Sequence, residues 1–262
     1  DSGEVESPDY FGAYQFANDS RYQILHTETK WLPGAANLFN FRGCVSEVEN
    51  GNRYDVVGAV AKRLSFFPGR TAGALRVVGL DDTGNGPPGT IQSLPRGNSL
   101  RDYQFQHDAS FIRGAHILRY GAGYNQIRLN QRADLYAAGS YRFNSITDLL
   151  AGRTRSADLM APGSDSTRRY RQHMFHLFAQ DEWRVARNFN LTLGLRYEPY
   201  STPSELDGKV ATFLDPVTDQ APTVGGALFQ NRSRGNVAPR AALAWDVSGT
   251  GRTVIRAGSG IF

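Results

Sequence analysis

Apolar and polar residues alternate along eight stretches of the chain, and the clearest of these is 189–200. Its apolar positions all share one parity: Phe189, Leu191, Leu193, Leu195 and Tyr197. The positions between them carry Asn, Thr, Gly, Arg and Glu side chains. Alternation of this kind predicts a strand with one apolar and one polar face. The same pattern recurs at residues 20–31, 37–48, 102–113, 116–131, 170–185, 237–247 and 252–262.

The predicted strands are long, and their connections alternate between short and long. Membrane-spanning strands need about nine to eleven residues, whereas ordinary globular strands have about five or six. Four connections are tight turns rich in Gly, Pro or Asn: 33–36, 113–116, 186–188 and 248–251. The other three are long loops at about 49–101, 132–169 and 201–236. Short periplasmic turns and long extracellular loops are typical of transmembrane β-barrels.

The long loops contain short predicted elements of their own. Residues 74–80 and 139–145 have the composition of short strands. Residues 145–152 predict one or two helical turns, with Ser145 as the N-cap and Gly152 at the end. We therefore expect an all-β fold: an antiparallel wall segment of a transmembrane β-barrel, made of about eight long strands.

The two faces of the predicted strands favour a wide barrel. The three tryptophans lie on apolar faces near short turns, which is the position of membrane-interface anchors: Trp31, Trp183 and Trp245. Charged side chains on the opposite face would cost several kcal/mol each in a dry core. We therefore expect that face to line a wet or plug-filled lumen. The expected lumen residues are Arg119, His176, Glu182, Arg196, Glu198, Arg240 and Arg256.

Composition and motifs exclude several other classes of protein. The 29 basic and 25 acidic residues give a net charge of +4 without a basic block, so no nucleic-acid partner is expected. No run of 18 apolar residues predicts a transmembrane helix. The first ten residues lack the pattern of a signal peptide. Cys44 is the single cysteine, and His173 and His176 should point to opposite faces of a strand. We expect no enzyme activity, no cofactor and no metal.

Several segments resemble TonB-dependent receptors of the Oar type, which carry a carboxypeptidase-regulatory-like N-terminal domain. The most specific are FNSITDLLAG (143–152), LFAQDEWRVARNFNLTLGLRYE (177–198), TVGGALFQNRSRGNVAPRAALAWD (223–246) and GRTVIRAGSGIF (251–262). The resemblance implies a stretch of a 22-stranded barrel in the outer membrane of a Gram-negative type of cell. It also implies a TonB partner, which would bind regions outside this chain.

The domain division expected from this resemblance is a polar N-terminal segment, 1–19, followed by a partial outer-membrane barrel, 20–262. The expected function is energy-coupled passage of an unidentified extracellular ligand across the outer membrane, with membrane lipid around the wall. Candidate ligand contacts come from the long loops: Tyr141, Arg153, Arg155, Arg168, Arg169, Phe229 and Arg232. Two alternatives stay open, a complete eight-stranded barrel with a structural or adhesion role and a soluble carbohydrate-binding β-sandwich.

Overall fold

The computed structural model describes residues 7–8, 14–56, 73–79, 95–228 and 235–261, and these residues are almost entirely β-structure. Ten strands of the described chain form one sheet, with the order β1-β2-β3-β5-β6-β9-β10-β14-β15 and with β11 beside β9. They are β1 (Ser7–Pro8), β2 (Tyr14–Trp31), β3 (Asn37–Val56), β5 (Arg96–Arg113), β6 (His116–Ala133), β9 (Thr167–Ala186), β10 (Phe189–Tyr197), β11 (Ser204–Glu205), β14 (Val237–Asp246) and β15 (Val254–Gly260).

The eight predicted strands are confirmed as β2, β3, β5, β6, β9, β10, β14 and β15. Several extend farther into the predicted long loops than the apolar pattern does, because polar residues continue the pairing. Arg21 forms an ion pair with Glu49 at 2.7 Å, and Arg53 forms one with Asp19. Glu49 and Arg53 lie beyond the predicted end of one strand at residue 48, and Asp19 lies before the predicted start of the other at residue 20. Within the described residues, no helix is long and apolar enough to span a membrane.

The chain divides into two compact units, each described here by itself. The first unit consists of Asp1–Gln23, Glu47–Leu100 and Leu129–Arg169. The second consists of Ile24–Ser46, Arg101–Arg128 and Tyr170–Phe262. Both units therefore take residues from β2, β3, β5, β6 and β9, whose pairing follows the sequence order.

The first unit contains a small separate sheet built from loop residues. It consists of β4 (Ala74–Val77), β7 (Ser140–Phe143) and β8 (Ser156–Asp158), with β4 parallel to β7 and β8 antiparallel to it. Both loop strands expected from the sequence are therefore confirmed, whereas β8 was not predicted. The side chains of Phe143 and Val77 are 0% and 1% exposed and form its core with Tyr141.

A short helix, α1 (Ile146–Leu150), follows β7 as the sequence predicted. The Ser145 hydroxyl accepts a hydrogen bond from the Asp148 amide at 3.1 Å, so Ser145 is the N-cap. Gly152 follows the helix with a φ of 67°, a conformation that glycine adopts without strain. In the second unit, the long loop after β10 contains the two-stranded pair β12 (Ala211–Thr212) and β13 (Thr223–Val224).

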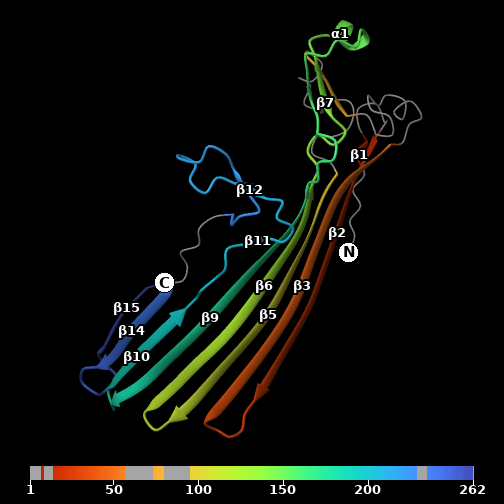
Figure 1. Cartoon of the computed structure of the whole chain (residues 1–262). Helices are drawn as coiled ribbons and strands as arrows, with labels where there is room; N and C mark the ends of the chain where they lie inside the picture. The colour runs from red at the N-terminus through yellow and green to blue at the C-terminus, as the bar shows by residue number, and fades with distance from the viewer. Residues whose placement is uncertain (1–6, 9–13, 57–72, 80–94, 229–234, 262) are drawn as a thin grey trace. The chain divides into compact units, whose positions relative to one another are not determined.

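The second unit also contains the four predicted tight turns, and Figure 1 shows them at the same end of the strands. Each of the four connects two neighbouring antiparallel strands of the sheet. In the turn between β5 and β6, Gly114 has a φ of 59° and precedes Ala115, which is the pattern of a two-residue hairpin with glycine first. In the last, the Asp246 carboxylate accepts backbone hydrogen bonds from Gly249 at 3.1 Å and from Gly251 at 2.6 Å.

Candidate functional site

Cross-strand register in the second unit brings the predicted lumen residues to one face of the sheet. Directly opposed residues share a face, and Gly194 of β10 lies opposite Gln180 on β9 and Arg240 on β14. Arg240 in turn lies opposite Gly260 on β15. The same parity includes all seven predicted residues: Arg119, His176, Glu182, Arg196, Glu198, Arg240 and Arg256. We refer to this surface as the polar face.

Ion pairs and hydrogen bonds connect the side chains of the polar face. Arg119 on β6 pairs with Glu182 on β9 at 2.7 Å, and Gln180 Nε2 donates to the same carboxylate at 3.1 Å. The side chains of Arg119 and Glu182 are 49% and 34% exposed, so this pair is open to water. Arg196 of β10 pairs with Glu198, just beyond the end of that strand, at 2.5 Å. The polar face is therefore charged, partly neutralised and accessible to solvent.

Two glycines of β6 make room for rings of β9 on the polar face. A Cβ on Gly123 would lie 2.0 Å from the ring of His176. A Cβ on Gly121 would lie 2.4 Å from the ring of Phe178. Each ring therefore lies directly over a glycine, and rings packed in this way stabilise glycine positions in designed sheets. Gly123 thus gives the His176 ring its place on the polar face, a role of Gly123 that the alternation pattern alone did not indicate.

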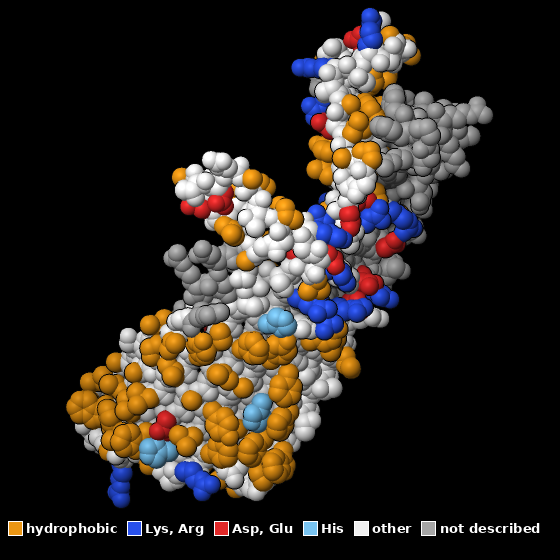
Figure 2. All heavy atoms as spheres, viewed as in Figure 1, with side chains coloured by type: hydrophobic (Ala, Val, Ile, Leu, Met, Phe, Trp, Pro, Cys, Tyr) orange, Lys and Arg blue, Asp and Glu red, His pale blue; other side chains and the backbone are white. Residues whose placement is uncertain are grey.

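The opposite surface, which we call the apolar face, carries the three tryptophans. Trp183 lies opposite Leu191, and Trp245 lies opposite Phe189 and Ile255. The three tryptophans are 57% (Trp31), 39% (Trp183) and 42% (Trp245) exposed. Figure 2 shows hydrophobic side chains gathered over the strands of this unit, with histidines among them. A surface so apolar and so exposed indicates a nonaqueous neighbour.

Aromatic rings pack together on the apolar face near the short turns. The rings of Trp31 and Phe39 stack at 5.1 Å, and Phe39 meets Phe111 edge to face at 5.3 Å. Trp183 stacks on His116 at 5.3 Å. The Nδ1 atom of His116 lies 2.8 Å from a carboxylate oxygen of Asp181, so a polar pair lies within this apolar surface.

The H-x-x-H pair lies on opposite faces, as predicted. Tyr124 Oη contacts His173 Nδ1 at 2.8 Å on the apolar face, whereas His176 lies over Gly123 on the polar face. The two imidazoles therefore cannot share an ion. No group of three or more His, Cys, Asp or Glu side chains suited to a metal occurs among the residues that the structure describes.

The loop candidates of the first unit differ in their accessibility. Tyr141 is 5% exposed in the core of the small sheet, where burial raises the pKa of its hydroxyl. Arg155 is exposed, and Arg153 is exposed and pairs with Asp148 at 3.2 Å. Among these candidates, the arginines rather than Tyr141 are available to a ligand. Phe229 and Arg232 lie outside the described residues.

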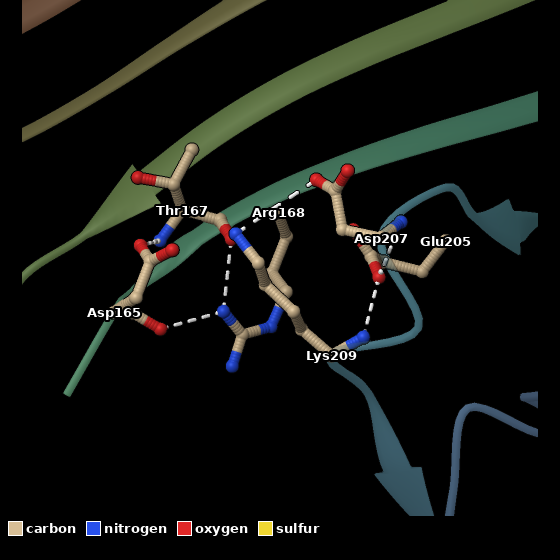
Figure 3. Close-up of polar contacts among 6 residues, drawn as sticks. All are labelled: Asp165, Thr167, Arg168, Glu205, Asp207 and Lys209. Atoms are coloured by element: carbon tan, nitrogen blue, oxygen red, sulfur yellow. Dashed lines mark hydrogen bonds and ion pairs between the residues drawn. The ribbon is translucent and has the colours of Figure 1, made fainter.

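Arg168 and Arg169 begin strand β9 in the first unit. Arg168 donates to the carbonyls of Asp165 at 2.7 Å and Thr167 at 2.9 Å, which holds the guanidinium close to the backbone (Figure 3). Asp165 in turn accepts from the Thr167 amide at 2.8 Å. Arg169 is exposed and has interactions of its own.

A charged turn in the second unit was not predicted as a site. The Glu205 carboxylate accepts from the amides of Asp207 at 3.1 Å and Lys209 at 2.7 Å (Figure 3). Lys209 Nζ also lies 3.8 Å from Asp207 Oδ2. The Asp-Gly pair at 207–208 was the available signal, because Gly208 has a φ of 65°. This turn shapes the long loop after β10 and leaves few charges free for a ligand.

Comparison with known proteins gives one family and a distant structural likeness. A family model described as "Outer membrane beta barrel domain" matches residues 2–262. The crystal structure of the ferric citrate transporter FecA in the unliganded form aligns at 12% identity and a TM-score of 0.39. That alignment covers 95% of this chain and 28% of the transporter's chain, so this chain spans little more than a quarter of its length. The comparison with curated proteins finds no match.

Proposed function

Since the chain belongs to the family of outer membrane beta-barrel domains and is a protein of the outer membrane, we propose that it forms part of the wall of a TonB-dependent receptor of the Oar type. Such a receptor carries a ligand across the outer membrane with energy passed through TonB. The segments at 143–152, 177–198, 223–246 and 251–262 carry the resemblance to that group. The plug and the TonB-binding region would belong to parts of the receptor outside this segment.

The apolar face faces lipid in this proposal. From Trp183 to Phe175 on β9, and from Trp245 to Val237 on β14, each strand advances eight residues along this face. At about 3.4 Å per residue and a tilt of about 40°, eight residues rise roughly 21 Å along the membrane normal. This height is close to the apolar band of about 25 Å in outer-membrane barrels. The tryptophans then lie at the membrane interface, on the periplasmic side.

The charged polar face is the observation that carries the proposal of a wide barrel. Side chains fill the interior of an eight-stranded barrel, where an open row of charges would be costly to bury. In this chain Arg119 and Glu182 are paired yet remain accessible to water. This exposure supports a lumen large enough for a plug or a wet passage.

The long loops capture the ligand in this proposal. Arg153 and Arg155 follow α1 and are exposed, so an anionic or polar ligand could be bound there by charge-assisted hydrogen bonds. Deletion of residues 205–232 should leave the barrel folded, because β9, β10 and β14 pair without them. It should also weaken ligand binding, and unchanged uptake by this variant would count against a ligand role for that loop.

Energy coupling is tested with the full-length receptor purified from its own membrane. We expect the receptor to be retained on a column carrying the periplasmic domain of TonB, and an otherwise identical column carrying a non-cognate periplasmic protein is the control. A receptor whose electrophoretic mobility is that of a folded barrel, yet which passes through the TonB column, would refute the proposal. The variant that lacks residues 205–232 should be retained normally, because the loop is not needed for TonB binding.

A further inference from the structure

Three arginines of neighbouring strands form a row on the apolar face of the second unit. Gly114 and Ala115 form the turn between β5 and β6, so Arg113 lies opposite His116. Counting back along both strands places Arg101 opposite Arg128. The backbone hydrogen bond from the Asp134 amide to the Pro95 carbonyl, at 3.2 Å, has the same register at the far end of the pair.

The register between β6 and β9 adds the third arginine. The Arg184 amide donates to the Ala115 carbonyl at 2.7 Å, and counting along the two strands from this bond places Arg171 opposite Arg128. The Tyr124 ring lies 4.9 Å from the Phe175 ring, which agrees with the same register. Arg101, Arg128 and Arg171 therefore occupy three adjacent strands at one level, and we call them the arginine row.

The arginine row lies on the apolar face, farther from the short turns than the aromatic residues of that face. The Arg128 guanidinium lies 4.7 Å from the centre of the Tyr103 ring, and Tyr103 shares its parity with the aromatic residues of β5. Arg171 shares its parity with His173, which contacts Tyr124 at the edge of the apolar surface. Within the described residues, no carboxylate pairs with the guanidinium of Arg128 or Arg171.

Like charges that lie directly opposite one another across strands destabilise a sheet. The arginine row is four residues beyond Tyr124, or roughly 13 Å along the strand at about 3.4 Å per residue. It lies toward the end of the strands opposite the short turns. With the apolar face in lipid, this level is that of the headgroups in the outer leaflet.

We infer that the arginine row binds the phosphate group of an outer-leaflet lipid. Guanidinium groups bind phosphate oxygens in bidentate fashion, and those of Arg128 and Arg171, on adjacent strands, could share one phosphate. The Tyr103 ring, on which Arg128 stacks, helps to hold that guanidinium in place. The inference rests on the proposed orientation of the apolar face and adds a lipid site to it.

The experiment measures the lipid that stays with the purified full-length receptor. The receptor is incubated in detergent with lipid A, which carries phosphate groups, or with its dephosphorylated form, and retained lipid is quantified by mass spectrometry. We expect the receptor to retain lipid A but not its dephosphorylated form. The amount of retained lipid A should decrease about tenfold or more in the double variant Arg128→Gln and Arg171→Gln. Arg187→Gln, in the short turn between β9 and β10, is the matched control and should retain as much lipid A as the unaltered receptor.

Two further measurements keep the outcomes distinct. A double variant with Lys at both positions keeps the charge and should retain more lipid A than the Gln variant, provided that both migrate as folded barrels. Equal retention by the Gln variant and the control would overturn the inference, and so would complete displacement of lipid A by millimolar inorganic phosphate. Quenching of tryptophan fluorescence by lipids with brominated acyl chains tests the orientation itself; if quenching is absent, the proposed orientation fails rather than the arginine row.

Discussion

Replacement of Gly121 by alanine should destabilise the wall, although alanine is a small residue. The φ of Gly121 lies outside the left-handed region, so space and not backbone conformation requires glycine there. A Cβ at this position would lie 2.4 Å from a ring carbon of Phe178 and 2.7 Å from the His107 carbonyl oxygen. Ordinary contacts of a Cβ begin at 3.4 Å.

The cost follows from which of these neighbours can move. The Phe178 ring can turn aside, but the His107 carbonyl belongs to the backbone of β5 and moves only with the strand. Overpacking of this kind costs about 1–3 kcal/mol. Gly194→Ala is the matched control, because Gly194 lies on the same face in β10 and its Cβ would meet nothing closer than 3.7 Å. Where the new Cβ fits, Gly→Ala stabilises by about 0.4–1 kcal/mol.

The assay is equilibrium unfolding in urea of the full-length protein in lipid vesicles, followed by the electrophoretic shift between folded and unfolded barrel. We expect Gly121→Ala to unfold at a lower urea concentration than the unaltered protein and Gly194→Ala to unfold at the same or a higher one. Adding Phe178→Leu to Gly121→Ala should restore part of the loss, since the contact with the His107 carbonyl persists. If Gly121→Ala and Gly194→Ala unfold together, the close packing of β6 against β9 described above is wrong.

Three further changes test smaller features of the chain. Asp246→Ala removes the acceptor for the amides of Gly249 and Gly251 and should lower the free energy of unfolding by about 1–2 kcal/mol in the same assay. Asp246→Asn keeps one acceptor oxygen and should lower it less. An equal loss of stability in the two variants would contradict this role. Ser145→Ala removes the N-cap of α1. It should lower the free energy of local opening of that helix, measured by amide hydrogen exchange, by about 1 kcal/mol, while urea unfolding of the barrel stays unchanged. Burial raises the pKa of Tyr141 above its ordinary value of 10.0. The stability held by its neutral form is therefore fully present below pH 10 and is lost as the pH rises through the higher pKa. The absorbance titration of the full-length protein minus that of its Tyr141→Phe variant should have its midpoint above 10, and a midpoint at or below 10 would refute the burial.

The strands and turns could be predicted because their signals are local. Alternation in 189–200 gives the faces, and the Gly, Pro and Asn residues of the turns give the ends of the strands. The extension of β2 into the N-terminal segment and that of β3 into the first long loop could not be predicted, since pairs such as Arg53 with Asp19 join residues that are distant in the chain. The parallel pairing of β4 with β7 was missed for the same reason.

The candidate site was predictable as far as the parity of each strand and no farther. Parity placed Trp183 and Glu182 on opposite faces, as the structure does, but it could not show that Tyr141 is buried in the small sheet. The arginine row depends on register, which a turn of two residues sets for β5 and β6. One added residue in the turn at Gly114 would shift Arg128 to the other face relative to Arg101, because side chains alternate with a period of two. Gly114, with its φ of 59°, therefore determines the position of the proposed lipid site, about 14 residues or more than 40 Å farther along the strand at about 3.4 Å per residue.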